Sequence, residues 1–414
     1  MRVLNLIIFL YFLSGCVFIK AQVNDSINTQ KLREVEISTN TKPSVSLSTT
    51  PLQTIDKDEI LQRGIQSVAD AVRRFNGIVL KDYGGIGGLK TIAIRGMGAE
   101  HTSICYDGVM VSNVQSGQVD IGRFSLDNIS TISLSIGQSD DIFQTAKAFA
   151  SVGTLYLNTT IPQFESRAYE GGIKATAGSF GVFNPSVEYA QKLNDAFIVS
   201  VNGSWQRADG NYPFTREEDL LITERKRKNS DVDIYRTELN VYNDFAKLGQ
   251  LKTKLYYFDS ERGLPGSIVY GADYAAERLW DRDFFIQSSY SNKISSKLDL
   301  KSHLKYNNTY TRYEDIQASG KVVNKDRDQE VYASGSLLYA INDKISASFA
   351  QDFIYNTLNS EYTLFGNNLP YPERYTVLSA LALKYKVKRL TVTTSLLINY
   401  ASEKVKNDQP NSTY

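Results

Sequence analysis

The sequence predicts an α+β domain followed by an antiparallel transmembrane β-barrel, and three observations lead to this fold class. In residues 91–113, apolar residues alternate in short runs separated by Arg95-Gly96 and Asp107-Gly108, the pattern of a small sheet with tight corners. Beyond residue 166, about eleven longer segments alternate polar and apolar residues. The links between these segments alternate between short turns and long polar loops, and transmembrane barrels sort their connections in this way.

The composition narrows the class of protein. A length of 414 residues allows two or three domains. The 46 basic and 45 acidic residues give a net charge of +1, so no bulk electrostatic attraction to nucleic acid is expected. The 26 tyrosines and 19 phenylalanines suit strands that meet a membrane interface, although they equally suit a polysaccharide-binding β protein. After residue 20 no run approaches the roughly 18 apolar residues that a membrane-spanning helix needs.

Residues 1–21 are predicted to be a signal peptide. Arg2 precedes an apolar run over residues 6–13, which has the length of a secretory core and is too short to span a membrane. Cleavage is expected after Ala21, while a lipoprotein cleavage box ending in Cys16 is the alternative. Removal of Cys16 leaves Cys105 as the single cysteine, an inert residue of an alternating strand.

Residues 22–50 are mostly polar and contain one segment with strand character. In residues 32–38, Val35 and Ile37 fall on one face of an extended chain and the glutamates on the other. Such a segment can add as a strand to the sheet edge of another protein. A linker that merely contains two apolar residues is the other interpretation.

Residues 51–160 have the signals of a compact domain. Residues 53–56 and 78–80 are predicted strands, and the capping box from Ser67 to Asp70 starts a helix whose apolar stripe includes Val72 and Phe75. Asn76-Gly77 ends this helix. Residues 126–137 and 148–158 are two further predicted strands.

A glycine-rich loop precedes the strand that leads to Arg95. Gly84, Lys90 and Thr91 have the spacing of a phosphate-binding loop, but Leu89 stands where the second glycine belongs. A strand also follows, in place of the helix whose N-terminus would hold phosphate. A mobile glycine-rich loop is the preferred interpretation, and its residues are Tyr83, Gly84, Gly85, Gly87 and Gly88.

The motifs around Arg95 and Asp107 carry a resemblance to a known family. An I-R-G-x-G strand followed within about a dozen residues by Y-D-G-V-x-V resembles the plug domain of TonB-dependent outer-membrane receptors. The resemblance implies a plug at residues 51–160, with the glycine-rich loop at its apex facing the ligand, and barrel strands at 161–414. It also implies that Arg95 and Asp107 hold the plug by ion pairs and hydrogen bonds, to each other or to the barrel wall, while Gly96 and Gly108 form corners.

The same resemblance assigns a role to the segment after the signal peptide. Residues 32–38 are similar to the TonB box of the family, where the energy-coupling protein docks. The residues expected to take part are Leu32, Glu34, Val35, Glu36, Ile37 and Ser38.

Several stretches resemble a Bacteroidetes branch of this family that is often assigned to cobalamin uptake. They are residues 137–143, 210–214, 261–267 and 278–282. The strand at 148–158 departs from the family pattern because it lacks one glycine. Cobalamin is therefore the expected ligand, and siderophores and oligosaccharides are the alternative ligands. A sensor or surface-binding protein is the alternative to a transporter. The outer-loop ligand candidates are Tyr212, Phe214, Arg262, Pro265 and Trp280.

The strand count predicts an incomplete barrel. About eleven strands occupy about 230 residues, and a 22-stranded transporter barrel needs roughly twice that. The long loops expected between them are residues 208–233, 260–282, 313–328 and 358–374. We therefore expect the N-terminal part of a longer receptor.

No enzyme, cofactor or metal signature is present in the sequence. His101 and His303, the only histidines, have no likely set of metal ligands or catalytic partners near them. The basic residues 225–228 lie beside Glu217 and Glu218 and suit a solvated loop or contact with lipopolysaccharide phosphates. The expected partners are the energy-coupling protein, outer-membrane lipid and lipopolysaccharide, a small-molecule ligand and a surface lipoprotein, all at the outer membrane of a Gram-negative cell.

Overall fold

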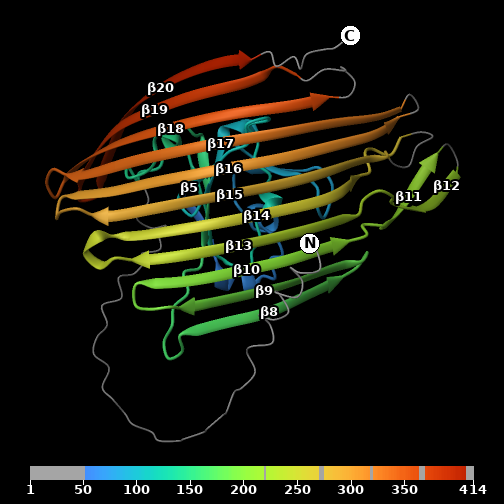
Figure 1. Cartoon of the computed structure of the whole chain (residues 1–414), viewed down its shortest axis with the longest axis horizontal. Coiled ribbons are helices and arrows are strands. Elements are labelled where there is room, and N and C mark those ends of the chain that lie inside the picture. Colours follow the sequence, from blue (N-terminus) through green and yellow to red (C-terminus); the bar gives the residue numbers. More distant parts are fainter. Residues whose placement is uncertain (1–51, 219–220, 270–274, 318–319, 363–368, 407–414) are drawn as a thin grey trace, which may run out of the picture. The chain divides into compact units, whose positions relative to one another are not determined.

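The computed structural model describes residues 52–218, 221–269, 275–317, 320–362 and 369–406 (Figure 1). The predicted signal peptide and the segment 32–38 lie outside these residues. Two sheets dominate the described part, a five-stranded sheet in residues 52–159 and an eleven-stranded sheet that follows it. No helix among the described residues is long and apolar enough to cross a membrane.

The five-stranded sheet has the order β1-β6-β7-β4-β5. Strands β4 and β7 are parallel and the other neighbours are antiparallel. A separate hairpin pairs β2 with β3 and carries the glycine-rich loop at its tip. In chain order the elements are β1 (Leu52–Asp56), α2 (Lys57–Gln62), α3 (Val68–Val72), β2 (Ile78–Asp82), β3 (Lys90–Ile94), η1 (Ala99–His101), β4 (Thr102–Tyr106), β5 (Val109–Val111), η2 (Ile121–Arg123), β6 (Ile129–Ile136), α4 (Ala146–Phe149) and β7 (Gly153–Thr159).

The local sequence explains how the helices of this domain begin. The Ser67 hydroxyl accepts a hydrogen bond from the backbone N–H of Asp70 at 3.1 Å, which confirms the predicted cap of α3. Asp56 caps α2 in the same way through the N–H of Glu59 at 3.0 Å. The apolar faces of these helices pack into a core with β3, β4, β6 and β7.

The eleven-stranded sheet is antiparallel throughout, in the order β20-β19-β18-β17-β16-β15-β14-β13-β10-β9-β8. In the described part of the chain, β8 and β20 are its two edges. Its strands are β8 (Tyr169–Gly178), β9 (Val182–Lys192), β10 (Phe197–Ala208), β13 (Val232–Asp244), β14 (Gln250–Leu264), β15 (Glu277–Lys293), β16 (Leu298–Gln317), β17 (Gly320–Ala340), β18 (Ile345–Tyr362), β19 (Tyr371–Val387) and β20 (Leu390–Lys406).

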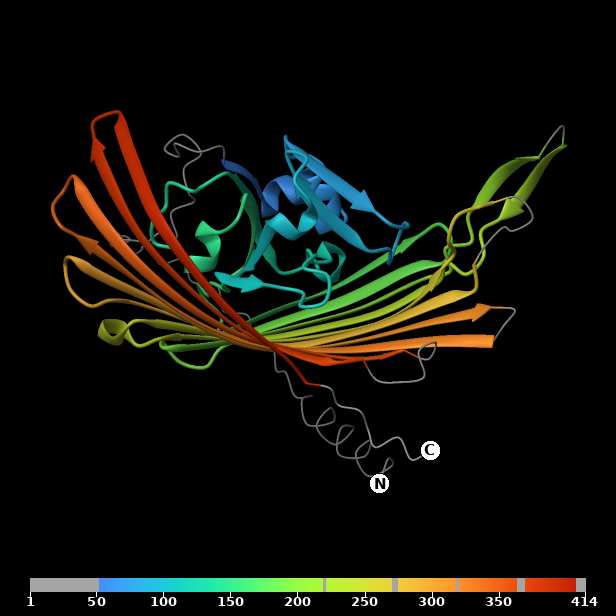
Figure 2. The ribbon, with the colours of Figure 1, turned by 90° about the horizontal axis from the view of Figure 1, so that it is seen from above.

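The two faces of this sheet differ in chemistry. One face presents apolar side chains that remain exposed, among them Phe353 at 55% and Ile398 at 60%. The opposite face places polar side chains such as Glu238, Lys254 and Asp352 against the first domain, which buries them. Figure 2 shows the sheet curving around residues 52–159, which lie on its concave side. The alternation read from the sequence is therefore the alternation between these two faces.

The strands are longer than their apolar patterns predict. Residues 313–328 were expected to form a loop, but β16 and β17 continue through most of them. Strands β14, β15, β18 and β19 likewise extend into the predicted loops 260–282 and 358–374. The prediction is wrong at these ends because backbone pairing continues where both faces of the sheet are polar, and the alternation that marks a strand is then lost.

Two other segments differ from the prediction. The predicted loop 208–233 contains a hairpin of β11 (Pro213–Glu218) and β12 (Leu221–Lys226). Ala148 and Phe149 were expected in a strand but belong to helix α4, and β7 begins only at Gly153. Ala148 and Phe149 are both buried, and a short apolar run does not distinguish a buried helical turn from a strand.

Candidate functional site

The contact between the first domain and the wall of the long sheet centres on Asp107. This residue occupies the corner between β4 and β5 with a φ of 50°, and Gly108 follows with a φ of 86°. Both carboxylate oxygens are used, because Lys254 of β14 lies 2.8 Å from one of them and Thr159 donates hydrogen bonds from its backbone N–H and its hydroxyl, each at 2.8 Å. Asp107 therefore ties β4 to β7 and both of them to the wall.

Lys254 connects this corner to a second carboxylate. Its ammonium lies 3.0 Å from Glu238 of β13 and 3.7 Å from the centre of the Tyr106 ring. Glu238 also accepts hydrogen bonds from the Tyr106 hydroxyl and from Asn128, both at 2.6 Å. Tyr106, Asn128, Glu238 and Lys254 are buried and the Asp107 side chain is 13% exposed, so these charges act on one another in a medium of low dielectric constant.

Burial changes the pKa values of Asp107 and Cys105 in the first domain. Burial by itself raises the pKa of the Asp107 carboxyl, but the Lys254 ammonium and the hydrogen bonds from Thr159 outweigh burial and hold that pKa below its usual range. Burial also raises the pKa of the Cys105 thiol to about 12, so this thiol is unreactive as long as it stays enclosed.

A second contact with the wall caps helix α4. The Asp352 carboxylate of β18 accepts hydrogen bonds from the backbone N–H groups of Ala146 at 3.2 Å and Lys147 at 2.8 Å. Tyr332 and Ser334 donate their hydroxyl hydrogens to the same carboxylate at 3.0 and 2.7 Å. Asp352 is wholly buried, so the wall supplies the acidic cap at the N-terminus of this helix.

The glycine-rich loop is held by two cations. Lys90 donates hydrogen bonds from its ammonium group to the Asp82 carboxylate at 3.1 Å and to the carbonyl oxygens of Gly85 and Gly88. Arg262 of β14 donates to the Gly87 carbonyl at 2.5 Å and also pairs with Asp281. Lys90 thus binds its own loop, an arrangement that differs from a phosphate-binding lysine.

The structure separates the five predicted outer-loop residues into two groups. Tyr212 and Phe214 lie at the β11–β12 hairpin, where the Tyr212 ring makes an edge contact with Phe180. Arg262 and Trp280 belong to paired strands, β14 and β15, and Arg262 is buried against the first domain. Trp280 packs beneath the Arg312 guanidinium at 4.9 Å, and Pro265 follows directly after β14.

Arg95 and Gly96 form an exposed corner after β3. Their φ angles of 51° and 79° are both left-handed, and the Arg95 N–H donates to the Gly77 carbonyl at 2.9 Å. Within the described residues Arg95 makes no ion pair, in contrast to the expectation from the resemblance. The corner itself is exposed, and Lys254 takes the place expected for Arg95 beside Asp107.

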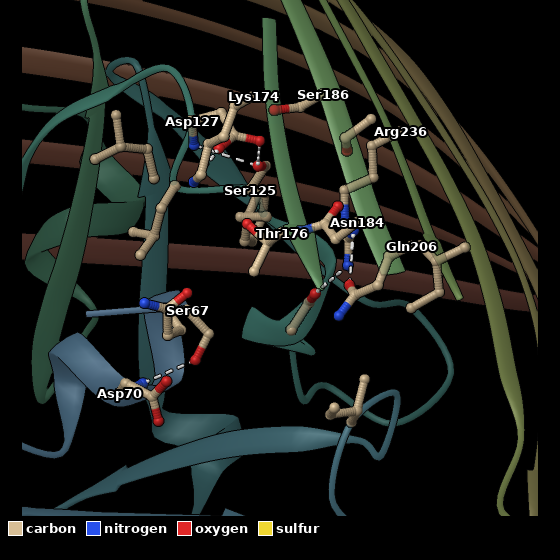
Figure 3. A pocket seen from close by; sticks show the side chains of 18 of the residues that line it. Ser67, Asp70, Ser125, Asp127, Lys174, Thr176, Asn184, Ser186, Gln206 and Arg236 are labelled. Carbon is tan, nitrogen blue, oxygen red and sulfur yellow. Dashed lines mark hydrogen bonds and ion pairs between the residues drawn. The ribbon is translucent and has the colours of Figure 1, made fainter. Parts of the chain in front are cut away.

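A cavity of about 740 Å³ lies between the first domain and strands β8 to β14. Its lining includes Gly85 to Gly88, the Asp127–Lys174 ion pair at 3.0 Å and Arg236, which donates to Gln206 at 3.2 Å. Figure 3 shows Ser67 and Asp70 of the first domain on one side of it and Asn184 and Ser186 of β9 on the other. In the described part of the chain, no group of three or more His, Cys, Asp or Glu side chains is arranged to hold a metal ion.

Comparison with known proteins identifies the first domain. Residues 44–148 match the family model of the TonB-dependent Receptor Plug Domain. These residues are therefore a domain of the plug type found in TonB-dependent receptors. Over 116 residues the chain is 24% identical to the vitamin B12 transporter BtuB of Vibrio vulnificus, a match that spans 27% of the chain and 18% of that protein.

The eleven-stranded sheet completes the similarity at the level of the fold. The copper transporter OprC aligns with 86% of the chain at a TM-score of 0.65 and 14% identity, the ferric citrate transporter FecA with 86% at 0.64 and 15%, and the FrpB iron transporter of Neisseria meningitidis with 86% at 0.66 and 10%. The chain spans 54%, 57% and 62% of these structures, respectively. It therefore has their fold, a plug followed by antiparallel barrel strands, and all these proteins are named as transporters.

The wall residues that hold the plug were not predicted from the sequence. Lys254, Glu238 and Asp352 lie on strands whose alternation was recognised, but a charged residue on the polar face of a strand has the same pattern whether it meets water or another domain. The one available signal is that these residues face inward, on the side opposite the exposed apolar positions.

Proposed function

We propose that this receptor imports a scarce nutrient across the outer membrane of a Gram-negative cell, driven through TonB. The observation that carries the proposal is the way Lys254 joins Asp107 to Glu238. A buried ionic contact costs desolvation energy and adds less net stability than apolar packing of the same size. Such a contact suits a domain that must be held in one position and later released.

The exposed face of the long sheet supports a location in the membrane. A row of apolar and aromatic side chains covers the outward positions of β18 to β20, including Phe349, Phe353 and Leu396. A soluble sheet exposing so broad an apolar surface would be expected to associate with other molecules, whereas lipid chains satisfy it. Outer-membrane lipid and lipopolysaccharide are therefore proposed partners, and a surface lipoprotein at the long loops is another.

Energy coupling is assigned to residues 32–38. In this proposal they become available in the periplasm when ligand binds, pair as a strand with the TonB protein and transmit force to β1, the first described strand of the plug. Strand β1 pairs with β6, so force applied at Leu52 acts on the sheet that carries Asn128 and the Glu238 contact.

Cobalamin is the proposed substrate. The sequence match to a vitamin B12 transporter supports this choice, as do the loops around Tyr212 and Pro265 that resemble the cobalamin branch. An iron-siderophore complex or an oligosaccharide is the alternative, and the solved structures of iron transporters with this fold favour the former of these two.

The test compares cells that express the receptor with cells whose receptor lacks residues 32–38. Binding and uptake of radiolabelled cyanocobalamin are measured in both. The expected result is unchanged binding with loss of uptake. Equal uptake by both receptors would contradict energy coupling through this segment, and binding without uptake by the intact receptor would favour the sensor or surface-binding function.

A further inference from the structure

The glycine-rich loop offers its side chains, and few of its carbonyl groups, to a ligand. The Gly85 and Gly88 carbonyls accept from Lys90, and the Gly87 carbonyl accepts from Arg262. The Tyr83 N–H donates to the Leu89 carbonyl at 3.0 Å and closes the loop. These bonds occupy the acceptors that could otherwise bind hydroxyl or ammonium groups of a solute.

Apolar side chains remain exposed on and below this loop. Tyr83 is 58% exposed and Ile86 is 45% exposed, and Ile86 lines the cavity between plug and wall. Leu61 of α2 also lines it and is 70% exposed. An exposed isoleucine on a loop fixed by two cations is a surface that a ligand with an apolar face can bury.

The charges that line the same cavity are balanced in number, and four of the six basic residues already pair with carboxylates. Six basic and six acidic residues contribute to the described lining. Arg73 lies 2.8 Å and Lys90 3.1 Å from Asp82, Lys174 lies 3.0 Å from Asp127, and Arg262 pairs with Asp281. A polyanion that entered would have to displace these carboxylates, and a ligand without net charge would not.

We infer that the cavity beneath the glycine-rich loop is a binding site for an uncharged solute with an extended apolar face, which packs on Ile86 and Leu61, and that it excludes polyanionic chelates. The inference rests on the proposed function, because it concerns the ligand of the same transporter. It goes further than cobalamin alone, since an uncharged hydroxamate chelate satisfies it and a citrate or catecholate chelate does not.

Calorimetry on the purified receptor tests this with four probes. Cyanocobalamin and ferrichrome are uncharged, whereas ferric citrate and ferric enterobactin are anionic. We expect an uncharged probe to bind and the anionic probes not to bind. Leu61→Ala and Ile86→Ala should each weaken binding of the uncharged probe by about tenfold, the loss expected for a partly buried apolar side chain. Leu248→Ala, at an exposed apolar residue in a short turn of the opposite end, is the matched control and should leave binding unchanged.

One further variant tests the role of the paired charges in excluding anions. Asp127→Asn frees Lys174 and should confer measurable binding of ferric citrate. Binding of either anionic probe by the unaltered receptor, failure of both uncharged probes, or unchanged binding of the uncharged probe to Ile86→Ala would overturn the inference. Uptake separates the two proposals: an anionic probe imported only when residues 32–38 are present overturns this inference and leaves the transporter standing. An uncharged probe that binds but is not imported leaves this inference standing and contradicts the proposed transport function.

Discussion

The Asp107 carboxylate at the β4–β5 corner lies 2.8 Å from the Lys254 ammonium on β14, and this contact joins the plug to the wall that surrounds it. Lys254 makes a second ionic contact, with Glu238 on the neighbouring strand β13. One cation is therefore shared by a carboxylate of the plug and a carboxylate of the wall. Movement of the plug separates only the first pair, so Lys254 keeps a partner when the plug leaves.

Removal of the Asp107 charge should loosen the plug more than removal of an exposed charge. Asp107→Asn leaves Lys254 with one carboxylate and weakens the hydrogen bonds that Thr159 donates. Because Lys254 keeps Glu238 as a partner, the expected cost is that of losing hydrogen bonds to a charged group, about 1.5–3 kcal/mol. We expect a lower thermal unfolding midpoint and a larger ion conductance in planar bilayers. Asp195→Asn, at a fully exposed turn residue, is the control. A midpoint for Asp107→Asn equal to that of the control would contradict the role of the contact.

The pH dependence of the same contact has a definite sign. Because the pKa of Asp107 is lower in the folded receptor than in the unfolded chain, its stabilisation is complete above the unfolded value of about 4 and is lost as pH falls through the folded value. The difference in unfolding midpoint between the receptor and Asp107→Asn should be constant from pH 7 to pH 5 and should shrink below pH 4. A difference that grows in acid would show that Asp107 is held in its protonated form.

These contacts mark the limit of what the sequence predicts. Strands β4 and β5 begin and end where the alternation of polar and apolar residues around Asp107 predicts. The prediction succeeds because successive side chains of a strand point to opposite faces, so a strand whose two faces differ in polarity leaves this pattern in the sequence. The eleven wall strands were recognised for the same reason. Lys254 and Asp352 were missed, since a single charged residue in an alternating strand gives no sign of the residue opposite it, which lies more than a hundred positions away in the chain.

Gly88 should be intolerant of any side chain, for a steric reason that does not involve backbone strain. A Cβ atom at this position would lie 2.3 Å from the Gly84 carbonyl oxygen, and backbone atoms cannot withdraw as a flexible side chain can. Gly88→Ala should therefore distort the loop that Lys90 holds, at a cost of about 1–3 kcal/mol, and weaken ligand binding at least tenfold.

Gly335→Ala is the control for this substitution, because no atom lies within 4 Å of the added Cβ. Calorimetry with the probe that binds the unaltered receptor gives the affinities, and circular dichroism checks that both variants retain their sheets. Equal affinity of Gly88→Ala and Gly335→Ala would show that the ligand does not depend on the shape of this loop.

The cap that the wall provides to α4 predicts a local effect of Asp352. Asp352→Asn retains the size of the side chain but removes the charge that accepts from the Ala146 and Lys147 N–H groups. We expect about 2 kcal/mol of lost stability, expressed as faster hydrogen exchange in residues 146–149. Asp343→Asn, in the exposed turn between β17 and β18, is the control and should leave hydrogen exchange in residues 146–149 unchanged. Unchanged protection of residues 146–149 in Asp352→Asn would show that packing alone holds α4.

Cys105 provides a reporter of plug movement in the intact receptor. Its side chain is buried beside Met110 and Ala148, and burial raises the pKa of its thiol from 9.0 to about 12. Only the thiolate reacts with maleimides, so at pH 8 the enclosed thiol should react about a thousandfold more slowly than an exposed one, before any steric protection is counted. With Cys16 replaced by alanine, maleimide labelling of cells should be slow at rest. It should accelerate when ligand and an energised TonB are both present, because displacement of the plug exposes β4. Labelling that remains slow during active uptake would mean that transport proceeds with β4 in place, and that the contact of Asp107 with Lys254 is not broken in the transport cycle.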